Sequence, residues 1–147
     1  MSEAAITSTT VPTEKMSDAA EKAFGMGFSF SVEPYIFSMA QKLSENSANG
    51  DKAIGYTGGC WKFHQLSNGG FYMTPDTDKK FNLVCDAYQN GKSVSAETMG
   101  IIACLYAYSH RSFGEGKAAE QCGEMYHKLR EYAYNHPDQG IIFKAID

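Results

Sequence analysis

The sequence has no apolar run long enough to cross a membrane. Its longest run, residues 99–108 (MGIIACLYAY), is about half of the ~20 residues that a membrane span requires. The N-terminus also lacks a basic region followed by an apolar stretch and a cleavage site. We therefore expect a cytoplasmic protein without a membrane partner, in which residues 99–108 form a buried helix.

A strong charge of either sign is also missing. The chain has 17 acidic and 13 basic residues, well mixed, and a net charge of −4. No basic footprint is present, which argues against direct binding of nucleic acid. Imitation of DNA would need on the order of twenty or more acidic residues in rows, because the duplex carries one negative charge per ~1.7 Å of axis. The charge balance therefore favours neither a nucleic-acid-binding protein nor a mimic of DNA.

The cysteines lack the CxxC spacing of zinc clusters and redox sites. Cys60, Cys85, Cys104 and Cys122 are far apart, which is typical of reduced thiols. Cys60 and His64 lie four apart, as half of a metal site would, but no second pair follows. We expect no catalytic residue, cofactor or metal. The alternative is a small enzyme, either a hydrolase that uses Cys60 or Cys85 with His64, or a metal enzyme that uses Cys60 and His64.

One triplet imitates a phosphate-binding loop. Gly91, Lys92 and Ser93 lie between a predicted strand and a predicted helix. The motif needs another glycine five residues before Gly91, where the chain has Asp86, and a carboxylate there would repel phosphate. The sequence therefore predicts a plain hairpin turn at Asn90 and Gly91.

Periodic patterns do define helices and strands. Apolar residues repeat at helical spacing in residues 32–43, after a possible cap at Ser31, and again in residues 117–134. Residues 95–108 and the C-terminus from Pro137 predict two more helices. The predicted fold is α+β, with a small antiparallel sheet of three to four strands in a hairpin meander and about four to five helices. We expect a flexible leader over residues 1–12 and a single domain over residues 13–147.

The centre of the chain predicts a β-hairpin. Asn68 and Gly69 favour a two-residue turn in which both residues have positive φ. This turn pairs Leu66 with Phe71, so one face carries Leu66, Phe71 and Met73, and the other carries Trp61, Phe63 and Tyr72. Either helices cover both faces, or one face stays open for a partner with Trp61 and Tyr72 as anchors. Gly58 and Gly59 predict an approach too tight for a side chain.

The same stretch resembles a family signature. Residues 56–76 (YTGGCWKFHQLSNGGFYMTPD) are similar to the central motif of the ArdB/KlcA antirestriction proteins, approximately GGxWxFxxLSNGGFYMxP. The resemblance continues through SAETMGIIACLYAY to the ending YHKLREYAYNHPDQGIIFKAID, and Cys60 departs from it because relatives more often have an aromatic residue there. The matching positions, called the signature residues below, are Gly58, Gly59, Trp61, Phe63, Leu66, Ser67, Asn68, Gly69, Gly70, Phe71, Tyr72, Met73 and Pro75.

The resemblance implies a bacterial protein of a plasmid or other mobile element that evades host defence. Such a protein would inhibit the type I restriction endonuclease complex, directly or indirectly, without chemistry of its own, and its oligomeric state stays open. The mixed charge argues against imitation of DNA as the mechanism. A DNA-binding accessory factor is a further alternative. Candidate partner contacts are Trp61, Tyr72, Glu131, Asp138 and Asp147.

Overall fold

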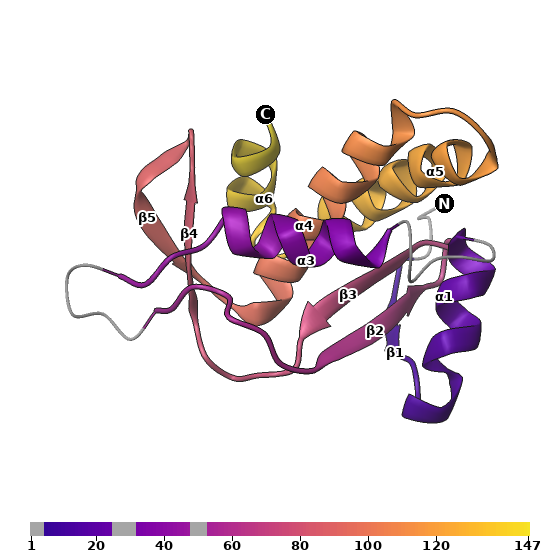
Figure 1. The fold of residues 1–147 in the computed structure, drawn as a ribbon, viewed down its shortest axis with the longest axis horizontal. Coiled ribbons are helices and arrows are strands. Elements are labelled where there is room, and N and C mark those ends of the chain that lie inside the picture. The colour runs from indigo at the N-terminus through magenta and orange to yellow at the C-terminus, as the bar shows by residue number, and fades with distance from the viewer. Residues whose placement is uncertain (1–4, 25–31, 48–52) are drawn as a thin grey trace.

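The computed structural model describes residues 5–24, 32–47 and 53–147, and it has the predicted α+β architecture (Figure 1). In this part of the chain, five α-helices accompany two small antiparallel sheets, one of three strands and one of two. The single domain expected over residues 13–147 stays a prediction. The helices are η1 (Thr13–Lys15), α1 (Met16–Phe24), α3 (Glu33–Lys42), α4 (Ala96–Ser112), α5 (Lys117–Ala133) and α6 (Gln139–Ile146). The strands are β1 (Ser8–Thr10), β2 (Trp61–Leu66), β3 (Phe71–Pro75), β4 (Phe81–Cys85) and β5 (Tyr88–Val94).

Helix α4 is the centre of the hydrophobic core, as its sequence predicts. Ser95 caps it by accepting a hydrogen bond from the backbone N–H of Thr98 at 3.1 Å. Nearly every residue from Ala96 to Tyr108 is buried, and α4 contacts α3, α5, α6 and β3. Helix α3 lies across it in Figure 1. No helix of the described residues is both long and apolar enough to span a bilayer.

Helix α4 also covers the free edge of β3. The Cys104 thiol accepts a hydrogen bond from the Met73 N–H (3.4 Å) and donates to the Met73 carbonyl (3.6 Å). The Tyr108 hydroxyl donates to the Phe71 carbonyl at 2.6 Å. A Cβ on Gly100 would lie 2.5 Å from the Met73 carbonyl oxygen, so only glycine allows this approach. Side chains of a helix thus satisfy backbone groups that another strand would otherwise bind.

The other edge of this sheet is formed by residues that were predicted to be a flexible leader. Within residues 1–12, Ser8–Thr10 form β1, which pairs antiparallel with β2, and Ser8 lies opposite Leu66. The Val11 N–H donates to the Phe63 carbonyl at 2.8 Å, and the Val11 side chain is buried. An edge strand is held mainly by backbone hydrogen bonds, which need no apolar pattern in the sequence. The prediction of a flexible leader is therefore wrong from residue 8 onward.

The expected meander divides between two sheets. Strand β4 pairs with β5, and Ser44 and Ile54 form isolated bridges to β4. The turn between β4 and β5 lies at residues 86–87, so the turn predicted at Asn90 and Gly91 is wrong. Gly91 (φ 90°) lies inside β5, near a shift in the register with β4. The Gly-Lys-Ser triplet consequently lies in a strand and does not lead directly into a helix.

The two C-terminal helices confirm the helical periodicity. Helix α5 buries Ala119, Cys122, Met125, Leu129 and Ala133, which recur on one face. Helix α6 buries Ile142 and Ala145, so the C-terminus docks on the body as predicted. Helix α3 begins at Glu33, and its proposed cap Ser31 lies outside the described residues.

Candidate functional site

The signature hairpin has a three-residue loop in place of the predicted two-residue turn. The Gly69 N–H donates to the Leu66 carbonyl at 2.9 Å, and the Leu66 N–H donates to the Gly70 carbonyl at 2.8 Å. Residues 67–69 therefore form the loop. Gly69 has φ 89°, whereas no non-glycine residue of the described chain has positive φ, so Asn68 does not adopt the predicted conformation.

The longer loop shifts the register by one residue. Phe63 pairs with Met73 and His64 pairs with Tyr72, so the predicted pairing and the predicted faces are wrong. Phe63 lies on the same face as Phe71, with their ring centroids 5.4 Å apart, whereas Tyr72 lies on the opposite face and stacks on His64 at 4.6 Å.

Both faces of the hairpin are covered. Trp61 is 8% exposed, and its Nε1–H donates to the Tyr56 hydroxyl at 2.9 Å beneath Phe37 of α3. Tyr72 is 0% exposed. An open face with these two anchors is therefore wrong, because α3 packs on one side and the α4–α5 region on the other.

Asn68 fastens the loop to α5. Its side-chain oxygen accepts the Gly70 N–H at 2.9 Å, and its Nδ2 donates to the Lys128 carbonyl at 2.9 Å and to the Glu131 carboxylate at 3.5 Å. A Cβ on Gly70 would lie 2.9 Å from the Leu66 side chain and 3.0 Å from the Lys128 Cβ. This half of the signature consequently holds the hairpin against a helix. An open groove of about 440 Å³ lies beside it, between the loop, α1 and α5.

Tyr72 belongs to a polar network at the start of α4. Its hydroxyl donates to Glu97 at 3.0 Å and accepts from Ser8, whose Oγ is 2.9 Å away. The other Glu97 oxygen is 2.8 Å from Nε2 of His136, whose Nδ1 accepts the Asp138 N–H at 3.0 Å. Because Nδ1 is an acceptor, the proton lies on Nε2. The hydrogen bond from His136 is the main cause that lowers the pKa of Glu97, and that from Tyr72 adds to it.

His64 is used by the fold and is not available as a ligand. Its Nε2 is 2.8 Å from the Thr74 hydroxyl, and its Nδ1 is 3.4 Å from the Thr10 hydroxyl. Burial lowers its pKa, which favours the neutral ring. Cys60 is exposed in the segment before β2. Within the described residues, no group of three or more His, Cys, Asp and Glu side chains could hold a metal.

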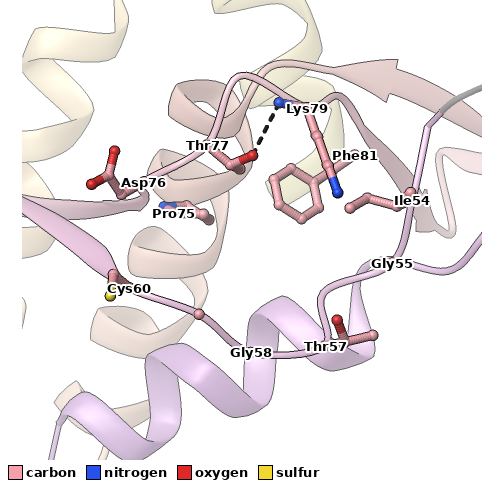
Figure 2. A pocket seen from close by; sticks show the side chains of 11 residues that line it. Ile54, Gly55, Thr57, Gly58, Cys60, Pro75, Asp76, Thr77, Lys79 and Phe81 are labelled. Atoms are coloured by element: carbon pink, nitrogen blue, oxygen red, sulfur yellow. Dashed lines mark hydrogen bonds between the residues drawn. The ribbon is translucent and has the colours of Figure 1, made fainter.

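The two ends of the signature, Gly58 with Gly59 and Pro75, line a small pocket (Figure 2). It has a volume of about 160 Å³. Gly58 (φ 121°) and Gly59 (φ 118°) form part of its wall, and no atom lies within 4 Å of a Cβ placed on either residue. The tight approach predicted there is wrong, because the backbone conformation is what requires glycine. The lining residues are Ile54, Gly55, Thr57, Gly58, Gly59, Cys60, Pro75, Asp76, Thr77, Lys79 and Phe81.

The pocket carries one basic and one acidic side chain. Asp76 is 3.4 Å from the ammonium of Lys62, and in Figure 2 its carboxylate points away from the other lining side chains. Lys79 forms no ion pair with any described residue. Its backbone N–H donates to the Thr77 hydroxyl at 3.2 Å, which fixes the loop that carries it. Lys79 therefore lines the pocket together with the apolar ring of Phe81, and no carboxylate of a described residue is paired with its ammonium.

The three C-terminal acids differ in their surroundings. Asp138 is half-buried and accepts the Thr98 hydroxyl at 2.7 Å, so it serves the fold. Glu131 and Asp147 are exposed. The sequence did not indicate Lys79, Thr57 or Phe81 as site residues. The only available signal was the polar loop that directly follows the signature, because the pocket draws its lining from segments that meet only in the fold.

Comparison with known proteins identifies similar chains along the whole length. A family model described as antirestriction protein matches residues 54–147. The uncharacterized protein YafX of Escherichia coli K12 is 36% identical over 97% of this chain and 88% of its own length. An E. coli antirestriction protein KlcA is 29% identical over 84% of this chain and 82% of its own length.

A solved structure has the same fold. It covers 100% of this chain and 99% of its own chain, with a TM-score of 0.83 and 28% sequence identity. It is a structure from a study of KlcA and ArdB, which show a novel fold and antirestriction activity against type I DNA restriction systems in vivo but not in vitro.

Proposed function

This chain belongs to the antirestriction protein family of the ArdB/KlcA type, and from that premise we propose that it inhibits type I restriction endonucleases in the bacterial cytoplasm. It thereby protects incoming DNA of mobile elements. The observation that carries this proposal is the similarity in fold over nearly all of both chains to proteins with that activity in vivo.

The inhibition we propose is contact with a protein and requires no catalysis. The signature residues of the hairpin are used for packing, for backbone conformation and for hydrogen bonds within the fold. The catalytic alternative, Cys60 with His64, loses its geometric basis because both ring nitrogens of His64 lie near threonine hydroxyls. A binding mechanism accounts for these features without a further assumption.

The charge distribution supports contact over imitation of DNA. The 17 acids and 13 bases nearly balance. Charges of both signs lie side by side on the surface, as in the exposed pair Lys62 and Asp76. A mimic of the duplex would need long rows of one sign.

KlcA and ArdB show antirestriction activity in vivo but not in vitro. Such behaviour supports an inhibition that depends on a condition or a protein of the cell, and the proposed target is the endonuclease during translocation or a host protein that acts on it. The proposed partner is therefore the type I complex, reached directly or through an intermediary.

Plating efficiency tests this proposal. Unmodified phage would be plated on hosts with a type I system or with a type II enzyme, with and without expression of this protein. We expect higher plating efficiency on the type I host alone. Equal plating with and without the protein, while it is soluble and folded in the cell, would contradict the proposed function.

Exchange of surface acids tests the mechanism in the same assay. Glu131→Gln and Asp147→Asn remove two exposed carboxylates on α5 and at the C-terminus. Under imitation of DNA, inhibition should fall with each acid removed, wherever that acid lies. Under specific contact, only acids at the interface should matter, and exposed acids elsewhere, such as Glu14 and Glu115, should be replaceable without effect.

A further inference from the structure

The backbone beside the pocket is open. The amides of Thr57, Gly58 and Gly59 form no hydrogen bond with any residue that the structure describes. Their neighbours are engaged: the Tyr56 N–H donates to the Ser44 hydroxyl at 2.8 Å, and the Cys60 carbonyl accepts the Asp76 N–H at 2.8 Å. Unpaired backbone N–H groups without side chains over them can donate hydrogen bonds to the carbonyl groups of a bound peptide.

The pocket next to this backbone favours an anion with an apolar stem. The Lys79 ammonium and the hydroxyls of Thr57 and Thr77 supply donors, while Phe81 and Pro75 supply apolar surface (Figure 2). The carboxylate of Asp76 is directed outward and lies near Lys62, so it competes little for Lys79. A charged hydrogen bond from an ammonium to a carboxylate is among the stronger polar contacts.

The volume limits the ligand to one side chain. The volume of about 160 Å³ is below the range of roughly 300–1,000 Å³ that is typical of pockets for drug-sized ligands. A single acidic side chain suits a space of this size, whereas a nucleotide is far larger. With one cation and one anion in the lining, the pocket also offers little to the dense charge of a nucleic-acid backbone.

We propose that this pocket binds a single acidic side chain of a protein partner, whose backbone carbonyl groups accept hydrogen bonds from the amides of residues 57–59. The biological meaning of the site rests on the proposed function, because it gives the chemistry of the contact through which inhibition would occur. The binding itself is independent of that function and is tested separately.

Nuclear magnetic resonance of the full chain tests the binding directly. The probe is a capped tripeptide, acetyl-Ala-Glu-Ala-amide, and its matched control carries Gln in place of Glu. We expect saturable shifts of the Gly58 and Gly59 amide signals with the Glu peptide, with a Kd on the order of 1 mM because only one side chain is anchored. The Gln peptide should bind about fivefold more weakly or not at all.

Substitution of Lys79 sharpens the test. Lys79→Met keeps the aliphatic stem and removes the charge, and Lys80→Met is the matched control because Lys80 is exposed and does not line the pocket. Lys79→Met should weaken binding of the Glu peptide about fivefold, and Lys80→Met should leave it unchanged. No saturable shift at Gly58 and Gly59, or equal binding of the Glu and Gln peptides, would overturn the proposal. So would inorganic phosphate binding more tightly than the Glu peptide.

The plating assay connects the site to inhibition. Lys79→Met should reduce protection on the type I host, and Lys80→Met should retain it. If the wild-type chain gives no protection, the proposed function fails, yet the peptide titration still decides whether the pocket binds a carboxylate. If protection is unchanged in Lys79→Met, the pocket is not the contact through which inhibition occurs.

Discussion

The signature contains two glycine pairs that meet opposite surroundings. Gly69 and Gly70 lie against the Lys128 side chain, and a Cβ on Gly70 would meet three atoms at 3.0 Å or less. Gly58 and Gly59 have nothing within 4 Å of the same position. Gly70 is needed because the hairpin packs tightly on α5, whereas Gly58 and Gly59 are needed for their backbone conformation alone, as Gly69 also is at φ 89°. One motif thus has a part that builds the fold and a part that faces solvent.

The largest effect should come from filling the packed side. Gly70→Ala places a methyl group against Leu66 and the Lys128 Cβ, and it should lower the free energy of unfolding by about 2–3 kcal/mol in urea denaturation. The control is Gly123→Ala in α5, where the nearest atom is 3.8 Å away. That exchange should be neutral or stabilising by up to about 1 kcal/mol, because alanine favours helix. Similar losses in both variants would contradict the assigned packing.

The second-largest loss of stability should come from breaking the contact between Asn68 of the hairpin loop and α5. Asn68→Ala removes the bonds to Gly70 and to the Lys128 carbonyl, and it should cost about 1–2 kcal/mol in the same measurement. Ser67→Ala is the matched control on the adjacent residue, because it loses only an exposed bond from the Thr7 N–H. The control should lose about 0.5 kcal/mol or less. A larger loss in Ser67→Ala than in Asn68→Ala would reverse our ranking of the two contacts.

A glycine-to-alanine substitution in the pocket wall should lower the stability less than the same substitution at Gly70. Gly59→Ala puts a residue with a side chain at φ 118° but meets no atom, so it should cost about 1 kcal/mol through backbone strain alone. The measurement is the urea midpoint, compared with that of Gly70→Ala. A loss as large as that of Gly70→Ala would mean that the pocket wall is packed as tightly as the loop.

The smallest change in stability should come from lowering the pH, through protonation of His64 in the hairpin. Burial lowers the pKa of His64 below its ordinary 6.5, so the unfolded chain binds more protons than the folded chain in this range. Stability should therefore fall as the pH drops below about 6.5 toward the folded value. His64→Gln, which can still bond Thr74, should flatten the dependence of Tm on pH between 7 and about 5. An unchanged slope in this variant would show that another group is responsible.

A second loss should follow at lower pH. Hydrogen bonds from His136 and Tyr72 lower the pKa of Glu97 below its ordinary 4.5. Stability that depends on this carboxylate is present above that value and lost as the pH falls through the folded pKa. Glu97→Gln should remove this step from the Tm profile below about pH 4.5.

The helices could be predicted from the sequence because their signals are local. The apolar stripe of α5 predicted residues 117–134, and the helix spans Lys117–Ala133. The cap at Ser95 was also visible, because its partner Thr98 is three residues away. Each of these features depends on residues within a few turns of one another.

Pairing in the sheet depended on contacts that the sequence does not display. The dipeptide Asn68-Gly69 fits a two-residue turn, but Asn68 binds Lys128 of a distant helix, and the loop takes three residues. Because the loop is one residue longer than predicted, Trp61 and Tyr72, which were predicted to share a face, lie on opposite faces of the hairpin. Strand β1 was missed because its polar residues carry no apolar pattern. The pocket was missed because Lys79 and Gly58 meet only in the folded chain.

The contact between α4 and β3 also makes the Cys104 thiol a natural reporter of opening in the core. Cys60 is exposed, whereas Cys104 is fully buried with its sulfur bound to the Met73 backbone. Burial raises the pKa of the Cys104 thiol to about 12, so it is unreactive in the closed state. A thiol reagent should modify Cys60 at once and Cys104 only when the helix leaves the strand. The rate of modification at Cys104, followed separately from that at the buried Cys122, then measures how often α4 leaves β3, without any introduced label.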